Sequence, residues 1–67
     1  MQRNHYRVWF TRFPNTYHVQ FAPNKRLAVV GAKASARNLM FRGELTVGRI
    51  QRCFRDGREL NLSIKGV

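Results

Sequence analysis

The shortness of the chain constrains its fold more than any other feature. Its 67 residues allow only one hydrophobic core, because a chain of this length buries only about 60% of the surface that it exposes when unfolded. Domains of this size often gain stability from a disulfide or a structural metal. Cys53 is the single cysteine, and with His5 and His18 it provides too few ligands for a zinc site. We therefore expect one small basic domain over residues 1–67, frayed at 1–5, without cofactor or metal, for which a homodimer is a remaining source of stability.

The apolar content is sufficient for a globular fold. Apolar residues make up 43% of the chain, which argues against a disordered basic tail. The longest apolar run is Leu27 to Val30, far below the roughly 20 residues that span a bilayer, and no apolar signal core follows Met1. These features predict a cytoplasmic protein that has no membrane partner.

Positive charge is the strongest indication of a partner. Thirteen Lys and Arg residues oppose three acids, for a net charge of +10, and ten of the thirteen are arginine. The planar guanidinium binds two phosphate oxygens at once and also stacks on bases. The composition therefore predicts a polyanionic partner, which is nucleic acid, either DNA or RNA, or alternatively an acidic protein surface.

Two alternating runs begin the chain. Over residues 6–13, Tyr6, Val8 and Phe10 alternate with Arg7, Trp9 and Thr11, and residues 17–21 repeat the pattern. Such period-two alternation is typical of half-buried strands. Residues 14–16, Pro-Asn-Thr, have turn chemistry. We predict a β-hairpin here.

An alanine-rich segment follows the hairpin. Asn24 is suited to cap a helix that runs to about Arg42, with Gly43 as its stop. In the alternative interpretation, residues 27–31 form a short strand and the helix starts at Ala32. The apolar side of the longer helix would carry Ala28, Ala32, Ala36 and Leu39.

The last third of the chain allows two interpretations. In the first, residues 44–54 and 58–65 form a hairpin around a three-residue loop at residues 55–57, with Gly57 in the left-handed conformation and Gly48 as a bulge. In the second, Thr46 caps a helix that ends near Asp56. The first predicts an α+β fold of order ββαββ with the helix on one face of an antiparallel sheet. The second predicts a hairpin followed by a helix-turn-helix.

Strand alternation assigns side chains to the two faces of the predicted sheet. A single helix covers one face only, so the other carries a mixed basic, amide and aromatic surface on which Trp9 can stack a base. The alternative is that Trp9 lies in the core or under a dimer partner. We expect the helix to cover Tyr6, Val8, Phe10, Tyr17, Val19, Phe21, Leu60, Leu62 and Ile64. The opposite face would present Arg7, Trp9, Thr11, His18, Gln20, Asn61, Ser63 and Lys65.

Arginine is densest near the C-terminus. Arg49, Arg52, Arg55 and Arg58 would form a basic tip on a hairpin, or a stripe on a helix, and either can follow a phosphate backbone. The alternative is solvated surface charge. A second basic group lies on or beside the predicted helix and consists of Lys25, Arg26, Lys33, Arg37 and Arg42.

The chain has few residues of the types that catalyse reactions. The acids are Glu44, Asp56 and Glu59, too few for paired-carboxylate chemistry, and the glycines form no phosphate-binding loop. We expect no catalytic residues and no enzymatic activity.

The order of elements also resembles a known family. A hairpin, an Asn-capped alanine-rich helix and a strand over residues 44–53 are similar to the small RNA polymerase inhibitor of T7-like bacteriophages, over Tyr17 to Cys53. The resemblance implies a phage protein in the host cytoplasm that docks a basic strand on the host enzyme, with Arg49 and Arg52 as contacts. This chain adds Asp56, Gly57 and a further strand. Nucleic-acid binding is the leading functional prediction, and a phage-type inhibitor or adaptor is the alternative.

Overall fold

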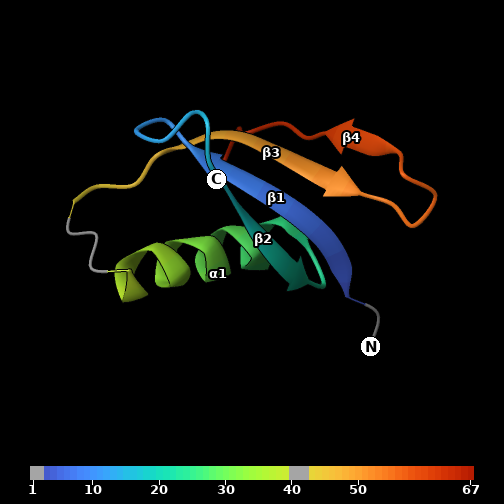
Figure 1. Cartoon of the computed structure of the whole chain (residues 1–67), viewed down its shortest axis with the longest axis horizontal. Coiled ribbons are helices and arrows are strands. Elements are labelled where there is room, and N and C mark those ends of the chain that lie inside the picture. The colour runs from blue at the N-terminus through green and yellow to red at the C-terminus, as the bar shows by residue number, and fades with distance from the viewer. Residues whose placement is uncertain (1–2, 40–42) are drawn as a thin grey trace.

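Four antiparallel strands and one helix make up the described part of the fold. The computed structural model describes residues 3–39 and 43–67. The elements are β1 (Asn4–Phe10), β2 (Tyr17–Ala22), α1 (Lys25–Asn38), β3 (Val47–Cys53) and β4 (Glu59–Asn61), and the sheet order is β2-β1-β3-β4. The helix packs on β2 and β1, along one side of the sheet (Figure 1). The α+β class is as predicted, whereas the helix-turn-helix alternative is wrong because residues 47–53 form a strand.

The first hairpin has different limits from those predicted. β1 includes Asn4 and His5, which the sequence placed in a frayed lead, because both pair with β2. It ends at Phe10 because the chain then turns: the Phe13 N–H donates to the Phe10 carbonyl at 3.0 Å. A second such bond joins Thr16 to Phe13 at 3.2 Å.

The helix begins where the sequence predicts. The Asn24 side chain accepts a hydrogen bond from the Leu27 N–H at 2.9 Å, which satisfies one of the donors that a helix start leaves open. Residues 27–31 are helical, so the strand alternative is wrong. The helix ends at Asn38, with Leu39 as the C-cap, so Gly43 is not its stop. The predicted end at Arg42 lies outside the described residues. No helix in the described ranges is long and apolar enough to cross a membrane.

A bulge in β3 changes which face of the sheet its side chains point to. Trp9 pairs with Arg49 and Phe10 with Val47, so Gly48 is the extra residue on β3. This confirms the predicted bulge. Because of it, Val47 and Ile50 both reach the core although three positions separate them.

The second hairpin closes through the predicted loop. The Phe54 N–H donates to the Arg58 carbonyl at 2.9 Å and the Gly57 N–H donates to the Phe54 carbonyl at 3.1 Å, with Gly57 at φ +90°. β4 is shorter than the predicted residues 58–65, because the chain then turns toward the helix. There the Ser63 carbonyl accepts a hydrogen bond from Lys25 Nζ at 2.7 Å.

The core lies between α1 and the sheet. One part of the predicted core is wrong: Tyr17, Val19 and Phe21 are exposed rather than covered by the helix. Leu60 and Ile64 are also about half exposed, whereas Leu62 packs on the core. The buried apolar residues are Tyr6, Val8, Phe10, Ala22, Ala28, Val29, Ala32, Ala36, Leu45, Val47 and Ile50.

Candidate functional site

One face of the sheet is turned away from α1, and we call it the open face. Directly paired residues on antiparallel strands share a face, so the register assigns every side chain to one side. Exposure agrees with this assignment, since Phe21 is 61% and Tyr17 45% exposed. The open face consists of His5, Arg7, Trp9, Tyr17, Val19, Phe21, Arg49, Gln51, Cys53, Glu59 and Asn61.

These side chains form three rows that run across the strands. Consecutive rows are two residues apart along each strand, which is about 7 Å. The first row is Tyr17, Trp9 and Arg49; the second is Val19, Arg7, Gln51 and Asn61; the third is Phe21, His5, Cys53 and Glu59.

Aromatic rings occupy the first and third rows. The Trp9 and Tyr17 ring centroids are 5.2 Å apart and tilted by 54°. His5 and Phe21 stack, with centroids 4.9 Å apart and 23° between the ring planes. Each pair thus combines an exposed ring on β2 with a half-buried ring on β1. The face therefore presents two aromatic platforms separated by the second row.

Arginines border the first platform. The Arg49 guanidinium carbon lies 4.7 Å from the centre of the Trp9 ring, and that of Arg7 lies 5.1 Å from the centre of the Tyr17 ring. Both distances are within the range of cation–π attraction. The platform therefore carries positive charge over both rings, and the Tyr17 ring remains about half exposed.

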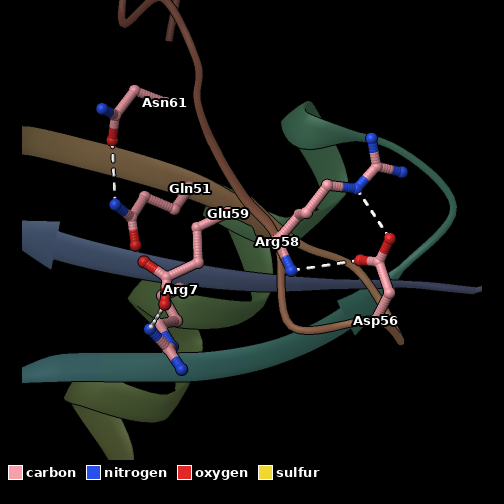
Figure 2. Close-up of polar contacts among 6 residues, drawn as sticks. All are labelled: Arg7, Gln51, Asp56, Arg58, Glu59 and Asn61. Carbon is pink, nitrogen blue, oxygen red and sulfur yellow. Dashed lines mark hydrogen bonds and ion pairs between the residues drawn. The ribbon is translucent and has the colours of Figure 1, made fainter.

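Arg7 is held in place by an ion pair. Its Nη1 donates to Glu59 Oε1 at 2.9 Å (Figure 2), whereas its Nε is buried without a hydrogen-bond partner in the described part of the chain. Desolvation lowers the pKa of Arg7, but the neighbouring Cys53, Glu59 and Tyr17 groups outweigh it and raise the pKa above its ordinary value. Arg7 therefore keeps its charge on this face.

Gln51 connects the second row to its neighbours. In one orientation its Nε2 donates to Asn61 Oδ1 at 2.9 Å (Figure 2). When the amide is turned by 180°, its oxygen accepts from Arg49 Nη2 at 2.7 Å and its nitrogen donates to Glu59 Oε2 at 3.3 Å. Gln51 is buried, so its amide holds the neighbouring side chains of the open face in place.

A hollow of about 320 Å³ borders Trp9 at the end of the first row. It is lined by Trp9, Phe10, Thr11, Pro14, Gly48 and Arg49. Gly48 has an additional steric role, because a Cβ there would lie 3.1 Å from Thr11 Cγ2. The hollow therefore extends the Trp9 platform beyond the edge of the strands.

The structure separates the residues that the sequence grouped as a site. Arg7, Trp9 and Arg49 come together on the open face. Arg52 points to the opposite side of β3, where its guanidinium lies 4.8 Å from the Phe54 ring centre. Arg55 and Arg58 lie in the loop between β3 and β4, and Lys33 and Arg37 lie on α1, across the sheet from Trp9.

Several members of the open face were missed in the sequence. Tyr17, Val19 and Phe21 were assigned to the core, and His18 and Gln20 were assigned to the open side; the structure reverses both assignments. Thr11, Ser63 and Lys65 lie outside the strands. The register explains the reversal: Tyr17 pairs with Trp9, so the odd-numbered residues of both strands share one face.

Potential metal ligands are scattered among the described residues. In the two described ranges no group of three His, Cys, Asp or Glu residues lies close enough together to hold a metal ion. Cys53 is a half-buried free thiol in the third row. What the open face offers is stacking, hydrogen bonding and positive charge.

The resemblance to the phage RNA polymerase inhibitor implies that Arg49 and Arg52 both contact the host enzyme. The two residues point to opposite faces of β3, so a flat partner surface that contacts Arg49 beside Trp9 does not reach Arg52 in the same way. The resemblance stays a prediction. Comparisons of the chain with protein-family models, with curated proteins and with solved structures found no match.

Proposed function

We propose that this protein binds single-stranded nucleic acid across the open face. The observation that carries the proposal is the pair of exposed aromatic platforms, Trp9 with Tyr17 and His5 with Phe21, on a sheet face turned away from the helix. Unstacked bases can lie on such rings, and each stacked base contributes about 1–3 kcal/mol. Bases inside a duplex are already stacked on one another and cannot do so.

Charge on and beside the face supports the same partner. Arg49 lies against the Trp9 ring, and its only described polar contact is with the Gln51 amide, so it has no carboxylate partner there. A base stacked at Trp9 therefore brings its phosphate close to an arginine whose charge is not neutralised. The second row adds the exposed amide of Asn61, which can bond to a base edge.

Their exposure shows that these aromatic residues are not part of the hydrophobic core. Tyr17 and Phe21 lie on the edge strand with about half of their surface in water, although each carries a large apolar ring. Leaving such rings exposed costs the free energy that burial would supply, about 25 cal/mol per Å² of apolar surface. An exposed patch of this type is characteristic of a binding surface.

Intrinsic fluorescence provides a direct test, because Trp9 is the single tryptophan in the chain. We expect a single-stranded oligonucleotide of about 12 nucleotides to quench Trp9 emission, since a base stacked on indole deactivates its excited state. Anisotropy of a labelled copy of the same oligonucleotide gives the affinity independently. Binding that leaves Trp9 emission unchanged would show that the bases lie elsewhere.

Substitution of Trp9 measures the contribution of the platform. Trp9→Ala should weaken single-strand binding about 5- to 100-fold, as expected from the loss of one stacked base, while Trp9→Phe retains most of the affinity. Val30→Ala is a matched control, because Val30 is an exposed apolar residue on the helix. Circular dichroism of each variant verifies that the fold is intact.

A protein partner is the alternative that this experiment tests. Exposed aromatic and arginine side chains are also enriched at protein interfaces. If the purified protein binds neither single-stranded DNA nor RNA at about 50 mM salt, where phosphate contacts are strong, the nucleic-acid proposal is wrong. An acidic protein surface would then be the remaining polyanion.

A further inference from the structure

A second concavity lies where the third row ends, and we call it the end cleft. Its volume is about 790 Å³, within the range of small-ligand sites. It is separate from the Trp9 platform, although His5, Phe21 and Cys53 belong to both the open face and the cleft. The cleft is lined by Arg3, Asn4, His5, Phe21, Arg52, Cys53, Phe54 and Arg55.

The lining is strongly positive. Three arginines, Arg3, Arg52 and Arg55, contribute to it, and none of the described lining residues is a carboxylate. The ion pairs of the described residues, Arg7 with Glu59 and Arg58 with Asp56, involve none of these three. The cleft therefore concentrates positive charge that the protein itself does not neutralise.

Arg52 is positioned in advance of any ligand. Its Nη2 donates to Asn4 Oδ1 at 3.0 Å, and its guanidinium carbon lies 4.8 Å from the centre of the Phe54 ring. These contacts fix the planar group but use only one of its five N–H donors. A guanidinium held in this way loses less conformational entropy when it binds an anion.

His5 adds an unsatisfied polar atom. Its ring is stacked on Phe21, and its Nε2 is buried without a hydrogen-bond partner in the described structure. Buried polar atoms normally have hydrogen-bond partners, so an unsatisfied imidazole nitrogen in a cationic cleft indicates that a ligand provides its partner.

We propose that the end cleft binds the terminal phosphate monoester of a single-stranded nucleic acid whose bases lie on the open face. This inference rests on the proposed function. The cleft adjoins the third row, where a strand that crosses the face from the first row leaves it. A terminal monoester carries a charge of about −1.5 to −2, against −1 for an internal diester. A cleft with three arginines that have no carboxylate partner among the described residues therefore favours the end.

The test compares three oligonucleotides of identical sequence that carry a 5′-phosphate, a 3′-phosphate or hydroxyl groups at both ends. We expect one phosphorylated form to bind about tenfold more tightly than the hydroxyl form, the size of one charge-assisted hydrogen bond. Which end is preferred reports the direction of the strand on the face. Equal affinity of all three forms for the wild-type protein overturns the inference and leaves the proposed function intact.

Variants locate the preference. Arg55→Gln, at an exposed loop position, should reduce the affinity ratio between the phosphorylated and hydroxyl forms toward one, and Arg52→Gln should do the same. Arg37→Gln is the matched control, because it removes one charge from α1, outside the cleft. A ratio that persists in both cleft variants places the phosphate elsewhere and overturns the assignment. Failure of every oligonucleotide to bind contradicts the proposed function itself, and the inference falls with it.

Discussion

The two faces of the sheet are built from the same strands but carry opposite kinds of side chain. The helix-covered face presents Val8, Phe10 and Ile50, each at most 1% exposed, against the alanines of α1. On the open face lie rings and guanidinium groups that remain partly in water. The comparison shows that the larger aromatic residues of β2 are on the side where no helix packs.

The small side chains of the helix explain this distribution. Three of the four buried helix residues are alanines, Ala28, Ala32 and Ala36, with Val29 as the fourth, so the helix approaches β2 closely. A Cβ at Gly31 would displace the end of the Gln20 side chain, which lies in the same space. The space under the helix therefore suits Gln20 and Ala22 rather than rings of the size of Tyr17 and Phe21.

Removing Ile50 should produce the largest effect. Ile50→Ala deletes a fully buried side chain and should lower the free energy of unfolding by about 2–5 kcal/mol, which approaches the whole stability of so small a domain. Val19→Ala, on the open face and 46% exposed, is the matched control and should cost less than about 1 kcal/mol. Urea titration followed by circular dichroism measures both. Equal losses would mean that the two faces do not differ as described.

Local features of the fold could be predicted from the sequence, because nearby residues determine them. The Asn24 cap, the left-handed Gly57 and the Gly48 bulge each depend on one residue and its immediate neighbours. Alternation could not predict which side chains of β2 face the helix, because the odd-numbered and the even-numbered residues alternate equally regularly. The connection over residues 11–16 and the close approach of the helix determine it, and neither can be read from β2 alone.

Only part of the candidate site could be predicted from the sequence. Arg7, Trp9 and Arg49 were identified because charge and aromatic character are visible in the composition, and the structure brings them together. Arg52 was grouped with Arg49 by proximity in sequence, but alternation along β3 sends the two to opposite faces. The end cleft joins residues from both ends of the chain, so only the folded sheet reveals it.

Replacing Tyr17 should separate binding from stability. Tyr17→Ala removes the exposed half of the first platform and should weaken single-strand binding by about 1–3 kcal/mol, whereas the loss of its contact with Trp9 should lower the free energy of unfolding by only about 1 kcal/mol. Anisotropy titration and urea titration of the same variant give the two values. Leu27→Ala, an exposed apolar residue on α1, is the control and should leave binding unchanged. A Tyr17→Ala protein with wild-type affinity would remove this platform from the proposed interface.

The smallest expected effect comes from the start of the helix. Asn24→Ala removes the side-chain acceptor for the Leu27 N–H and should lower the free energy of unfolding by about 1 kcal/mol, the usual contribution of an N-cap. Asn24→Asp keeps an acceptor oxygen and should retain most of the stability. Because the helix covers only the opposite face, the folded fraction of Asn24→Ala should bind single strands with the affinity of the wild-type protein. A lower affinity per folded molecule, together with a change in Trp9 quenching at saturation, would show that the open face depends on the helix start. The two faces of the sheet would then be less independent than their side chains indicate.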